Sequence, residues 1–279
     1  MKVTVLIDNR PAPELVEGPE LLCEWGLAFH IEHNGRQYLL DSGASGAFAA
    51  NARALGIDLA GIDCAVLSHA HHDHGGGMGT FFQTNSKAKF FIAQSAAENC
   101  WAGGKSHTGT EGERYIGLPP GVLQNYQERI TRVNDVTDIG TDTFIIPHST
   151  KGLEALGRDQ ELFIRQGEAM APDDLSHEQS LVFDTDEGLV IFNSCSHSGP
   201  EVILKEARAA LPGRPVRAYI GGLHLYKSSP EEIARVAGGL DGIARVFTGH
   251  CTGDEALALL RQQLGPAVVQ LHTGMRITF

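Results

Sequence analysis

The chain is richest in metal-binding side chains at Ser68-His69-Ala70-His71-His72-Asp73-His74-Gly75-Gly76-Gly77. Six consecutive positions supply four imidazoles and one carboxylate, and three glycines follow them. Neutral imidazole and carboxylate are donors that a borderline divalent ion such as zinc accepts, and the spacing His-x-His-x-Asp-His can divide them between two adjacent ions. Alternate side chains of an extended segment point the same way, so His69 and His71 can bind one ion. The turn into the glycines then directs Asp73 and His74 toward a second ion.

This histidine tract follows the apolar run Cys64-Ala65-Val66-Leu67, which reads as a buried strand. Proteins that alternate strands and helices place their sites at such strand ends, which argues against a solvated loop that binds metal adventitiously. The tract resembles the signature of the metallo-β-lactamase-fold superfamily, in which it lies on a loop between a strand and a helix. The resemblance covers essentially the whole chain.

Length and composition indicate one globular domain over residues 1–279, built from two pseudo-equivalent halves. The chain has 42% hydrophobic and 20% charged residues, and no Pro/Ser-rich linker divides it. Its five cysteines are odd in number and widely spaced, which favours a reducing cytoplasm over a disulfide framework. The first apolar run, residues 3–7, is far too short for a signal peptide or a membrane span.

The formal net charge of −12 bears on the partners of the chain. An acidic protein without a Lys/Arg cluster repels a polyphosphate backbone, so nucleic acid is not an expected partner. We expect a small-molecule substrate and no membrane. The sequence leaves the oligomeric state open, with a homo-oligomer as one option.

Strand-like and helix-like segments alternate in both halves of the chain. Strands are expected at residues 2–7, 89–93, 129–133, 143–147, 181–183, 188–192, 215–220, 244–247 and 268–279, with a hairpin over 26–40. Helices are expected at residues 47–55, 78–82, 201–211, 230–238 and 254–264. This α/β (α+β) pattern fits the fold that the resemblance implies, a four-layer αββα sandwich of two mixed β-sheets flanked by helices.

Asp41 ends the second strand of the expected hairpin and precedes a glycine turn. A carboxylate in this position can accept the remote N–H of a histidine ligand and so fix its tautomer and orientation. It could instead cap the helix expected at 47–55. The superfamily has an aspartate here, and the resemblance therefore favours the orienting role.

Two candidate ligands flank the hairpin expected at 181–192. The resemblance places the superfamily's third metal histidine just before such a hairpin, where His177 is the best match. Members that bind two metals usually carry a bridging aspartate after the hairpin, but this chain has Cys195 at the nearest position. A thiolate can bind zinc, although a buried cysteine is often a packing residue, so the number of metals stays open. His197 is either a further ligand or an acid/base group.

Two later strands each end in glycine and histidine, at His224 and His250. By chain order, His250 matches the last metal histidine of the superfamily, and His224 fits a catalytic or substrate-binding position. Earlier in the chain, the glycine-rich segment at about 98–122 shows no periodicity, which suits a lid over a pocket or a disordered surface loop. Lys105 and His107 are its candidates for substrate contact.

Four further motifs are similar to those of one branch of the superfamily, which contains the archaeal dihydropterin-linked ribofuranosyl-aminobenzene phosphate synthase and bacterial relatives. They are Asp-Asp-Leu-Ser-His-Glu-Gln-Ser-Leu at 173–181, Cys-Ser-His-Ser-Gly at 195–199, Gly-Gly-Leu-His-Leu at 221–225 and Gly-His-Cys-Thr-Gly at 249–253. The branch makes a pterin-like or phosphorylated substrate an option.

The expected function is hydrolysis of a small substrate by metal-activated water. One or two zinc ions are expected, with iron or manganese as alternatives. Asp73 would orient the nucleophile or bind the second ion, and His224 or His197 would protonate the leaving group. Two other functions are open: a synthase of the pterin branch, and a non-catalytic metal- or ligand-binding protein.

Overall fold

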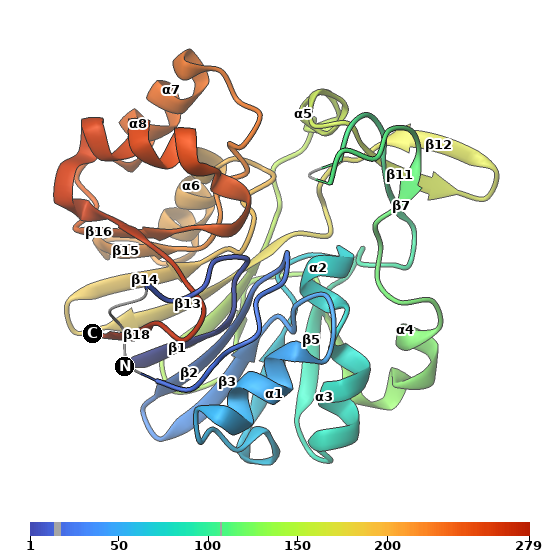
Figure 1. Cartoon of the computed structure of the whole chain (residues 1–279), viewed down its shortest axis with the longest axis vertical. Coiled ribbons are helices and arrows are strands. Elements are labelled where there is room, and N and C mark those ends of the chain that lie inside the picture. The colour runs from blue at the N-terminus through green and yellow to red at the C-terminus, as the bar shows by residue number, and fades with distance from the viewer. Residues whose placement is uncertain (14–17, 107) are drawn as a thin grey trace.

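A computed structural model describes residues 1–13, 18–106 and 108–279. Two seven-stranded sheets face each other, with helices on the outer face of each (Figure 1). The expected αββα sandwich is therefore confirmed, and all five expected helices are present within two residues of their expected ends. Among the described residues, no helix is long and apolar enough to cross a membrane.

The first sheet joins the N-terminal half of the chain to its last strand. Its order is β18 (Arg276–Thr278), β1 (Lys2–Ile7), β2 (Ala28–His33), β3 (Arg36–Leu40), β4 (Cys64–Val66), β5 (Lys89–Ala93) and β8 (Ile130–Val133). The β2–β3 hairpin turns through Asn34 and Gly35, both with positive φ, as the Asn-Gly pair predicts. From β3 to β8 the strands are parallel.

The second sheet is built from the C-terminal half. Its order is β17 (Val268–Gln270), β16 (Arg245–Thr248), β15 (Val216–Ile220), β14 (Gly188–Phe192), β13 (Gln179–Thr185), β10 (Thr143–Pro147) and β9 (Thr137–Asp138). Strands β14 to β17 are parallel, so their carboxyl ends lie at one edge of the sheet.

The helices cover the outer faces of the two sheets (Figure 1). α1 (Ala47–Ala54) and α3 (Met78–Thr84) pack on the first sheet, and α6 (Pro200–Ala210), α7 (Pro230–Leu240) and α8 (Asp254–Leu264) pack on the second. α6 and α7 each begin with a proline, and Ser229 caps α7 by accepting from the Glu232 N–H at 3.2 Å. The shorter elements are α2 (His72–Gly75), α4 (Val122–Asn125), α5 (Glu154–Asp159) and the 3-10 turns η1 (Leu59–Gly61), η2 (Gln127–Arg129), η3 (His250–Thr252) and η4 (Gly265–Ala267).

The apolar core between the sheets joins the two halves of the chain. Phe29 on β2 meets Phe192 on β14 edge to face, with ring centroids 5.7 Å apart. Phe183 on β13 packs against Phe192 in the same way. Burying one such ring contributes about 1.5–3 kcal/mol, and the cluster includes residues of strands from both sheets.

The structure differs from the expectations in two segments. The strand expected at 268–279 is two strands, β17 and β18, which belong to different sheets, because the chain turns at Gly274 with a φ of +82°. The expected loop at 98–122 is partly ordered in a third, four-stranded sheet, β12 (Ala169–Pro172), β11 (Leu162–Gln166), β6 (Cys100–Ala102) and β7 (Arg114–Tyr115). With α5, this sheet projects beside the sandwich (Figure 1).

Candidate metal centre

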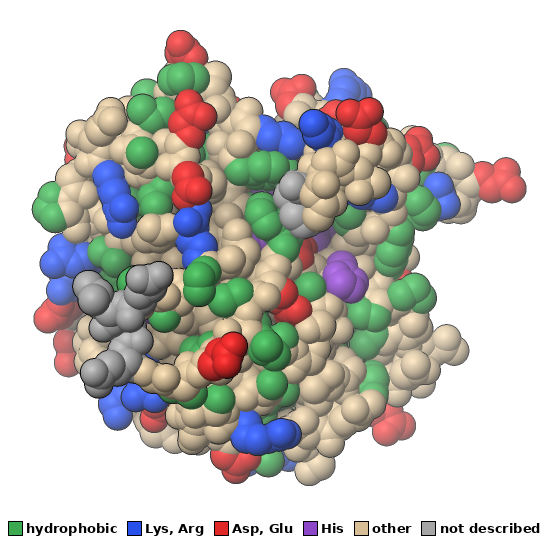
Figure 2. Space-filling view, in the orientation of Figure 1, with side chains coloured by type: hydrophobic (Ala, Val, Ile, Leu, Met, Phe, Trp, Pro, Cys, Tyr) green, Lys and Arg blue, Asp and Glu red, His purple; other side chains and the backbone are tan. Residues whose placement is uncertain are grey.

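The candidate ligands lie in loops that follow strands of both sheets. The histidine tract follows β4, the segment with Cys195 and His197 follows β14, and the segments with His224 and His250 follow β15 and β16. Because the parallel strands end at one edge, their loops meet there. On the face shown in Figure 2, basic and acidic side chains are interspersed.

Three imidazoles form the first group. One ring nitrogen from each of His69, His71 and His197 lies within 4.8 Å of the others. The Nε2 atom of each ring is buried and has no hydrogen-bond partner among the described residues. Buried polar atoms are normally paired, so these nitrogens have the geometry and the free valence of metal ligands.

Burial favours the neutral form of these imidazoles, which is the form that binds a metal. Burial, with the neighbouring His74 and His71, holds the pKa of His69 well below its ordinary value. Burial and then the facing His224 lower the pKa of His197 well below its ordinary value. Burial and then His177 lower the pKa of His71 to about 3.

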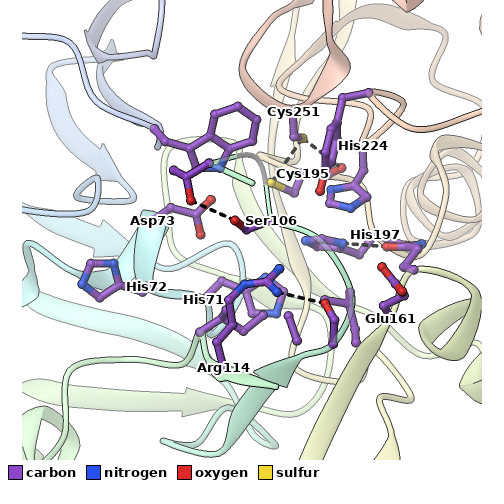
Figure 3. A pocket seen from close by; sticks show the side chains of 18 of the residues that line it. His71, His72, Asp73, Ser106, Arg114, Glu161, Cys195, His197, His224 and Cys251 are labelled. Carbon is purple, nitrogen blue, oxygen red and sulfur yellow. Dashed lines mark hydrogen bonds between the residues drawn. The ribbon is translucent and has the colours of Figure 1, made fainter. Parts of the chain in front are cut away.

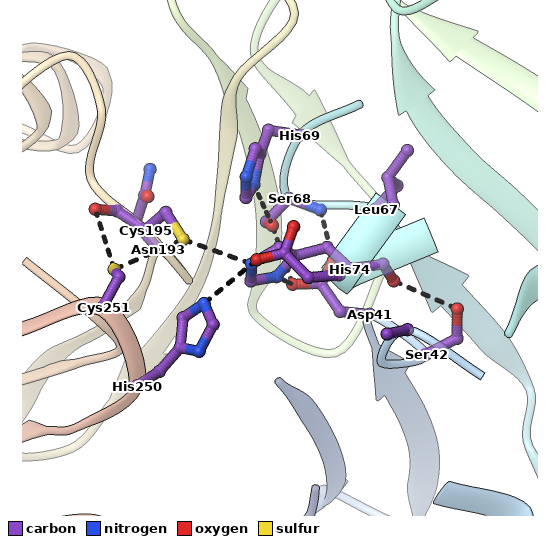
Figure 4. Close-up of polar contacts among 12 residues, drawn as sticks. Asp41, Ser42, Leu67, Ser68, His69, His74, Asn193, Cys195, His250 and Cys251 are labelled. Carbon is purple, nitrogen blue, oxygen red and sulfur yellow. Dashed lines mark hydrogen bonds and ion pairs between the residues drawn. The ribbon is translucent and has the colours of Figure 1, made fainter. Parts of the chain in front are cut away.

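Asp41 orients two of the histidines, as Figure 4 shows. Its Oδ2 atom accepts from His74 Nδ1 at 2.8 Å and from Ser68 Oγ at 2.7 Å, and its Oδ1 atom accepts from the Ser68 N–H at 2.7 Å. Ser68 Oγ in turn lies 2.8 Å from His69 Nδ1. One carboxylate thus positions His74 directly and His69 through a serine hydroxyl, in line with the orienting role expected of Asp41.

His197 is oriented by residues outside the histidine tract. Its Nδ1 atom lies 2.8 Å from Gln160 Oε1, and its carbonyl accepts from Gln160 Nε2 at 2.7 Å. The Glu178 carboxylate accepts from the backbone N–H groups of His197 and Ser198 at 2.8 and 3.0 Å. The ring therefore donates from Nδ1 and directs Nε2 toward His69 and His71, whose ring centroids lie 4.9 and 4.8 Å away.

A second group surrounds Cys195. Its Sγ atom lies 3.2 Å from His74 Nε2 and 3.4 Å from Cys251 Sγ. Asp73 Oδ2 lies 3.6 Å from His74 Nε2 and 3.3 Å from His250 Nε2. Imidazole, carboxylate and thiol donors of this kind suit a zinc-type ion.

The pKa values of the second group are shifted in different directions. Burial opposes the charge on Asp73, but the adjacent His74 and His250 hold the pKa of its carboxyl well below the usual range. Burial also opposes the charge on His250, yet Cys251 and Asp73 raise its pKa to about 9. Burial and the Cys251 sulfur raise the pKa of the Cys195 thiol well above its ordinary value.

His177, the expected third metal histidine, is hydrogen-bonded within the protein through both ring nitrogens. Its Nε2 atom pairs with Asp173 Oδ2 at 2.9 Å, and its Nδ1 atom accepts from the Ala70 N–H at 3.1 Å. Burial opposes a charge on this ring, but the Asp173 carboxylate raises the pKa of His177 well above its ordinary value. Both ring nitrogens are engaged, whereas the Nε2 atom of His197 has no partner among the described residues, so this geometry favours His197 over His177 as a candidate ligand beside His69 and His71.

His224 lies at the edge of the group. Its ring centroid is 4.2 Å from that of His197 and 5.3 Å from that of Tyr226. Its Nδ1 atom is buried without a hydrogen-bond partner among the described residues. His224 also lines the cavity above the site, so it can reach a bound substrate.

A cavity of about 440 Å³ opens over the centre (Figure 3). Trp25, Tyr115, Ile116 and Tyr226 give it apolar walls, and a histidine, carboxylate and cysteine cluster forms its floor. Arg114 reaches back to the loop that closes one side and donates to the carbonyls of residues 103 and 104 at 2.9 and 3.0 Å.

The expected substrate contacts of the loop differ in the structure. Lys105 is exposed, and its backbone carbonyl accepts from Lys227 Nζ at 2.8 Å. Its neighbours Ser106, Thr108 and Thr110 line the cavity, and a backbone bridge joins Lys105 to Glu111. His107 lies outside the described residues.

Sequence reasoning missed Gln160, Glu178 and Cys251. Gln160 follows α5 and lies far from any histidine in the sequence, so no local signal indicates its role. Glu178 and Cys251 are direct neighbours of the candidate residues His177 and His250, and that adjacency was the available signal.

Comparison with known proteins relates the chain to one superfamily. The model of the metallo-beta-lactamase superfamily matches residues 26–192. The chain is 27% identical to the 7,8-dihydropterin-6-methyl-4-(beta-D-ribofuranosyl)-aminobenzene-5'-phosphate synthase of Methanocaldococcus jannaschii, over 91% of this chain and 90% of that protein.

Solved structures agree with this relation. A crystal structure described as a metal-dependent hydrolase of the beta-lactamase superfamily has a TM-score of 0.82 and 26% identity, and the match covers 100% of this chain and 99% of that one. Zinc-bound PqqB from Methylobacterium extorquens has a TM-score of 0.54 and 12% identity with full coverage of both chains, which shows a shared fold alone.

Proposed function

The chain belongs to the metallo-beta-lactamase superfamily, and from this premise we propose that it is a metal-dependent hydrolase of a small substrate. One observation carries the proposal: the buried Nε2 atoms of His69, His71 and His197 lie together without partners among the described residues, and His71 and His197 line a cavity. Hydrolysis uses such a centre to generate a nucleophile next to the bond that breaks.

The donor set fits a divalent ion, with zinc as the first choice and iron or manganese as alternatives. His69, His71 and His197 would hold one ion, and Asp73, His74, Cys195 and His250 would hold a second. When bound there, such an ion would lower the pKa of a water molecule to about 7 and polarise the bond under attack.

The side chains around the ions have separate tasks. Asp73 lines the cavity, so its carboxylate would orient the attacking water by accepting a hydrogen bond from it, as the alternative to binding the second ion. His224 faces the same cavity beside His197, where its imidazole can donate a proton to the leaving group. All five cysteines are free, which supports a reducing compartment such as the cytoplasm.

A second candidate is a synthase that acts on a pterin-like, phosphorylated substrate. It is favoured by the archaeal synthase that is 27% identical over 91% of this chain. The apolar walls of the cavity suit a flat ring system, because aromatic side chains such as Trp25 and Tyr226 offer stacking surfaces.

Metal analysis together with an activity panel tests the proposal. The protein purified without added zinc should contain bound metal and hydrolyse at least one member of a phosphoester, thioester and lactone panel. His69→Ala and His197→Ala should bind less metal than the wild type and lose turnover. His72→Ala, which removes an exposed imidazole from the same tract, should keep both. If the protein turned over pterin or ribose phosphate substrates and no member of the hydrolysis panel, the result would favour the synthase.

A further inference from the structure

The sulfur of Cys251 lies within the candidate metal centre, although the sequence motif does not include Cys251 among the expected metal ligands. The Cys251 Sγ atom lies 3.4 Å from Cys195 Sγ, and both thiols are free. One ring nitrogen of His250 and these two sulfur atoms all lie within 4.8 Å of one another. Three soft or borderline donors thus converge on one point.

The separation of the two sulfur atoms suits a shared ion. Two thiolates bound to one tetrahedral zinc, at Zn–S distances of about 2.3 Å, lie about 3.8 Å apart. The observed separation of 3.4 Å needs a shift of only a few tenths of an ångström to reach that value. Figure 3 shows both sulfur atoms in the wall of the cavity, where an ion can reach them.

Packing does not account for the position of Cys251. Cys64 and Cys100 each belong to an apolar cluster of the core, as structural cysteines do. Cys195 and Cys251 are equally buried but belong to none of the apolar clusters of described residues. The sulfur of Cys251 therefore faces polar groups in place of aliphatic ones.

The neighbouring backbone leaves room for this sulfur. A Cβ atom added at Gly222 would lie 2.5 Å from Cys251 Sγ and 2.8 Å from the Ser194 carbonyl. Only glycine at this position lets the two loops approach closely enough to bring the thiols together.

We propose that Cys251 is a metal ligand, and that with Cys195 and His250 it makes the second half of the centre a two-thiolate site for a thiophilic divalent ion. The inference rests on the proposed metal-dependent function. Two thiolates favour zinc, cobalt or cadmium over manganese or magnesium, which prefer oxygen donors.

Cobalt(II) substitution tests the proposal by absorption, because sulfur-to-cobalt charge transfer gives a near-ultraviolet band that grows with the number of thiolates bound. The wild-type protein loaded with cobalt should show this band. Cys251→Ser and Cys195→Ser should each lower it to about half, since each removes one of two sulfur ligands. Cys23→Ser, which removes an exposed thiol, should leave it unchanged. A band of full height in Cys251→Ser would overturn the proposal.

Alkylation of the unmutated protein gives a measurement that does not depend on how a variant folds. Iodoacetamide labelling, read by mass spectrometry, should be slower at Cys195 and Cys251 when cobalt is bound and equally fast at Cys23 with or without cobalt. An unchanged rate at Cys251 would contradict the assignment. Neither readout needs a substrate. Cobalt binding without two-sulfur absorption overturns this inference alone, and a two-sulfur band without turnover overturns the proposed hydrolase alone.

Discussion

The side chain of Gln160 makes two hydrogen bonds to His197. Its Oε1 atom accepts from the ring Nδ1, and its Nε2 atom donates to the backbone carbonyl. Removing the side chain in Gln160→Ala frees the imidazole to rotate, and we expect metal affinity to fall by about 10–100-fold, as for other groups that orient a ligand. Gln160→Glu keeps an acceptor for Nδ1 and should restore part of the affinity. Competition with a chromophoric chelator measures both constants.

The matched control for this prediction is Gln262→Ala, an exposed amide on α8, which should bind metal like the wild type. Equal affinities for Gln160→Ala and the wild type would show that His197 needs no such support. A loss in Gln160→Ala that Glu does not relieve would indicate a packing role.

At the residue scale, the sequence predicts a centre but not every member of it. His69, His71, Asp73 and His74 could be found because one short tract carries them. The sequence favoured His177 as the third metal histidine and left His197 as a further ligand or an acid/base group, since both flank the same hairpin. The choice between them depends on Asp173 and Gln160, which come from the segments around the third sheet.

The contact of α2 with residues 42–45 depends on a glycine. A Cβ atom at Gly76 would lie 2.2 Å from the Ala44 carbonyl, although its φ of −59° suits any residue. Gly76→Ala should therefore destabilise the fold by about 1–3 kcal/mol through overpacking against backbone. Gly79, on α3, has no atom within 4 Å of such a Cβ, and Gly79→Ala should stabilise the helix by about 0.5–1 kcal/mol.

Urea unfolding of the two alanine variants measures these opposite signs. Stabilisation by Gly76→Ala would mean that α2 can move away from residues 42–45 without cost. A loss of stability in Gly79→Ala would mean that α3 is closely covered by groups other than those seen around Gly79.

At the scale of elements, periodicity and turn chemistry predicted the long helices and most strands of both large sheets, but not the two-residue strand β9. The third sheet could not be predicted, because β6 and β7 have three and two residues and β6 pairs with β11, about sixty residues later in the chain. The prediction of one strand over 268–279 was wrong for a similar reason, because the two ends of this segment pair with different sheets.

At the scale of the whole molecule, the alternation of strands and helices in both halves was enough to predict the sandwich.

A buried ion pair joins the second sheet of the sandwich to α6. The Glu206 carboxylate lies 3.2 Å from His148 Nδ1 and accepts from the Ser149 and Thr150 N–H groups at 2.9 and 2.8 Å. Burial opposes the charge on Glu206, but these contacts lower its pKa from 4.5 to about 2. Burial likewise opposes the charge on His148, and the Glu206 carboxylate raises the pKa of that ring above 6.5.

The two shifts define a pH window for stability. The stabilisation from Glu206 is fully present above pH 4.5 and is lost as the pH falls through about 2. The stabilisation from His148 is fully present below pH 6.5 and is lost as the pH rises through its raised pKa. The advantage of the wild type over Glu206→Gln should therefore be greatest between pH 4.5 and 6.5, at about 1–3 kcal/mol for a buried charged hydrogen bond. Urea unfolding across pH measures it, with Lys205→Gln on the exposed face of α6 as the control; a difference that does not vary with pH would contradict the assignment.

The candidate metal centre draws its ligands from both sheets, so a bound ion should stabilise the whole sandwich. His69 and His71 follow a strand of the first sheet, and His197 follows a strand of the second. An ion at a concentration 100-fold above its Kd adds about 2.7 kcal/mol to the free energy of unfolding. We expect a chelator to lower the Tm of the wild type and zinc to restore it, and we expect zinc to raise the Tm of His197→Ala by less, because this variant lacks a ligand of one of the two proposed ions. Calorimetry measures these Tm values, with His72→Ala as the control that should still bind metal. A wild-type Tm that changes with neither chelator nor zinc would show that metal binding does not stabilise the fold.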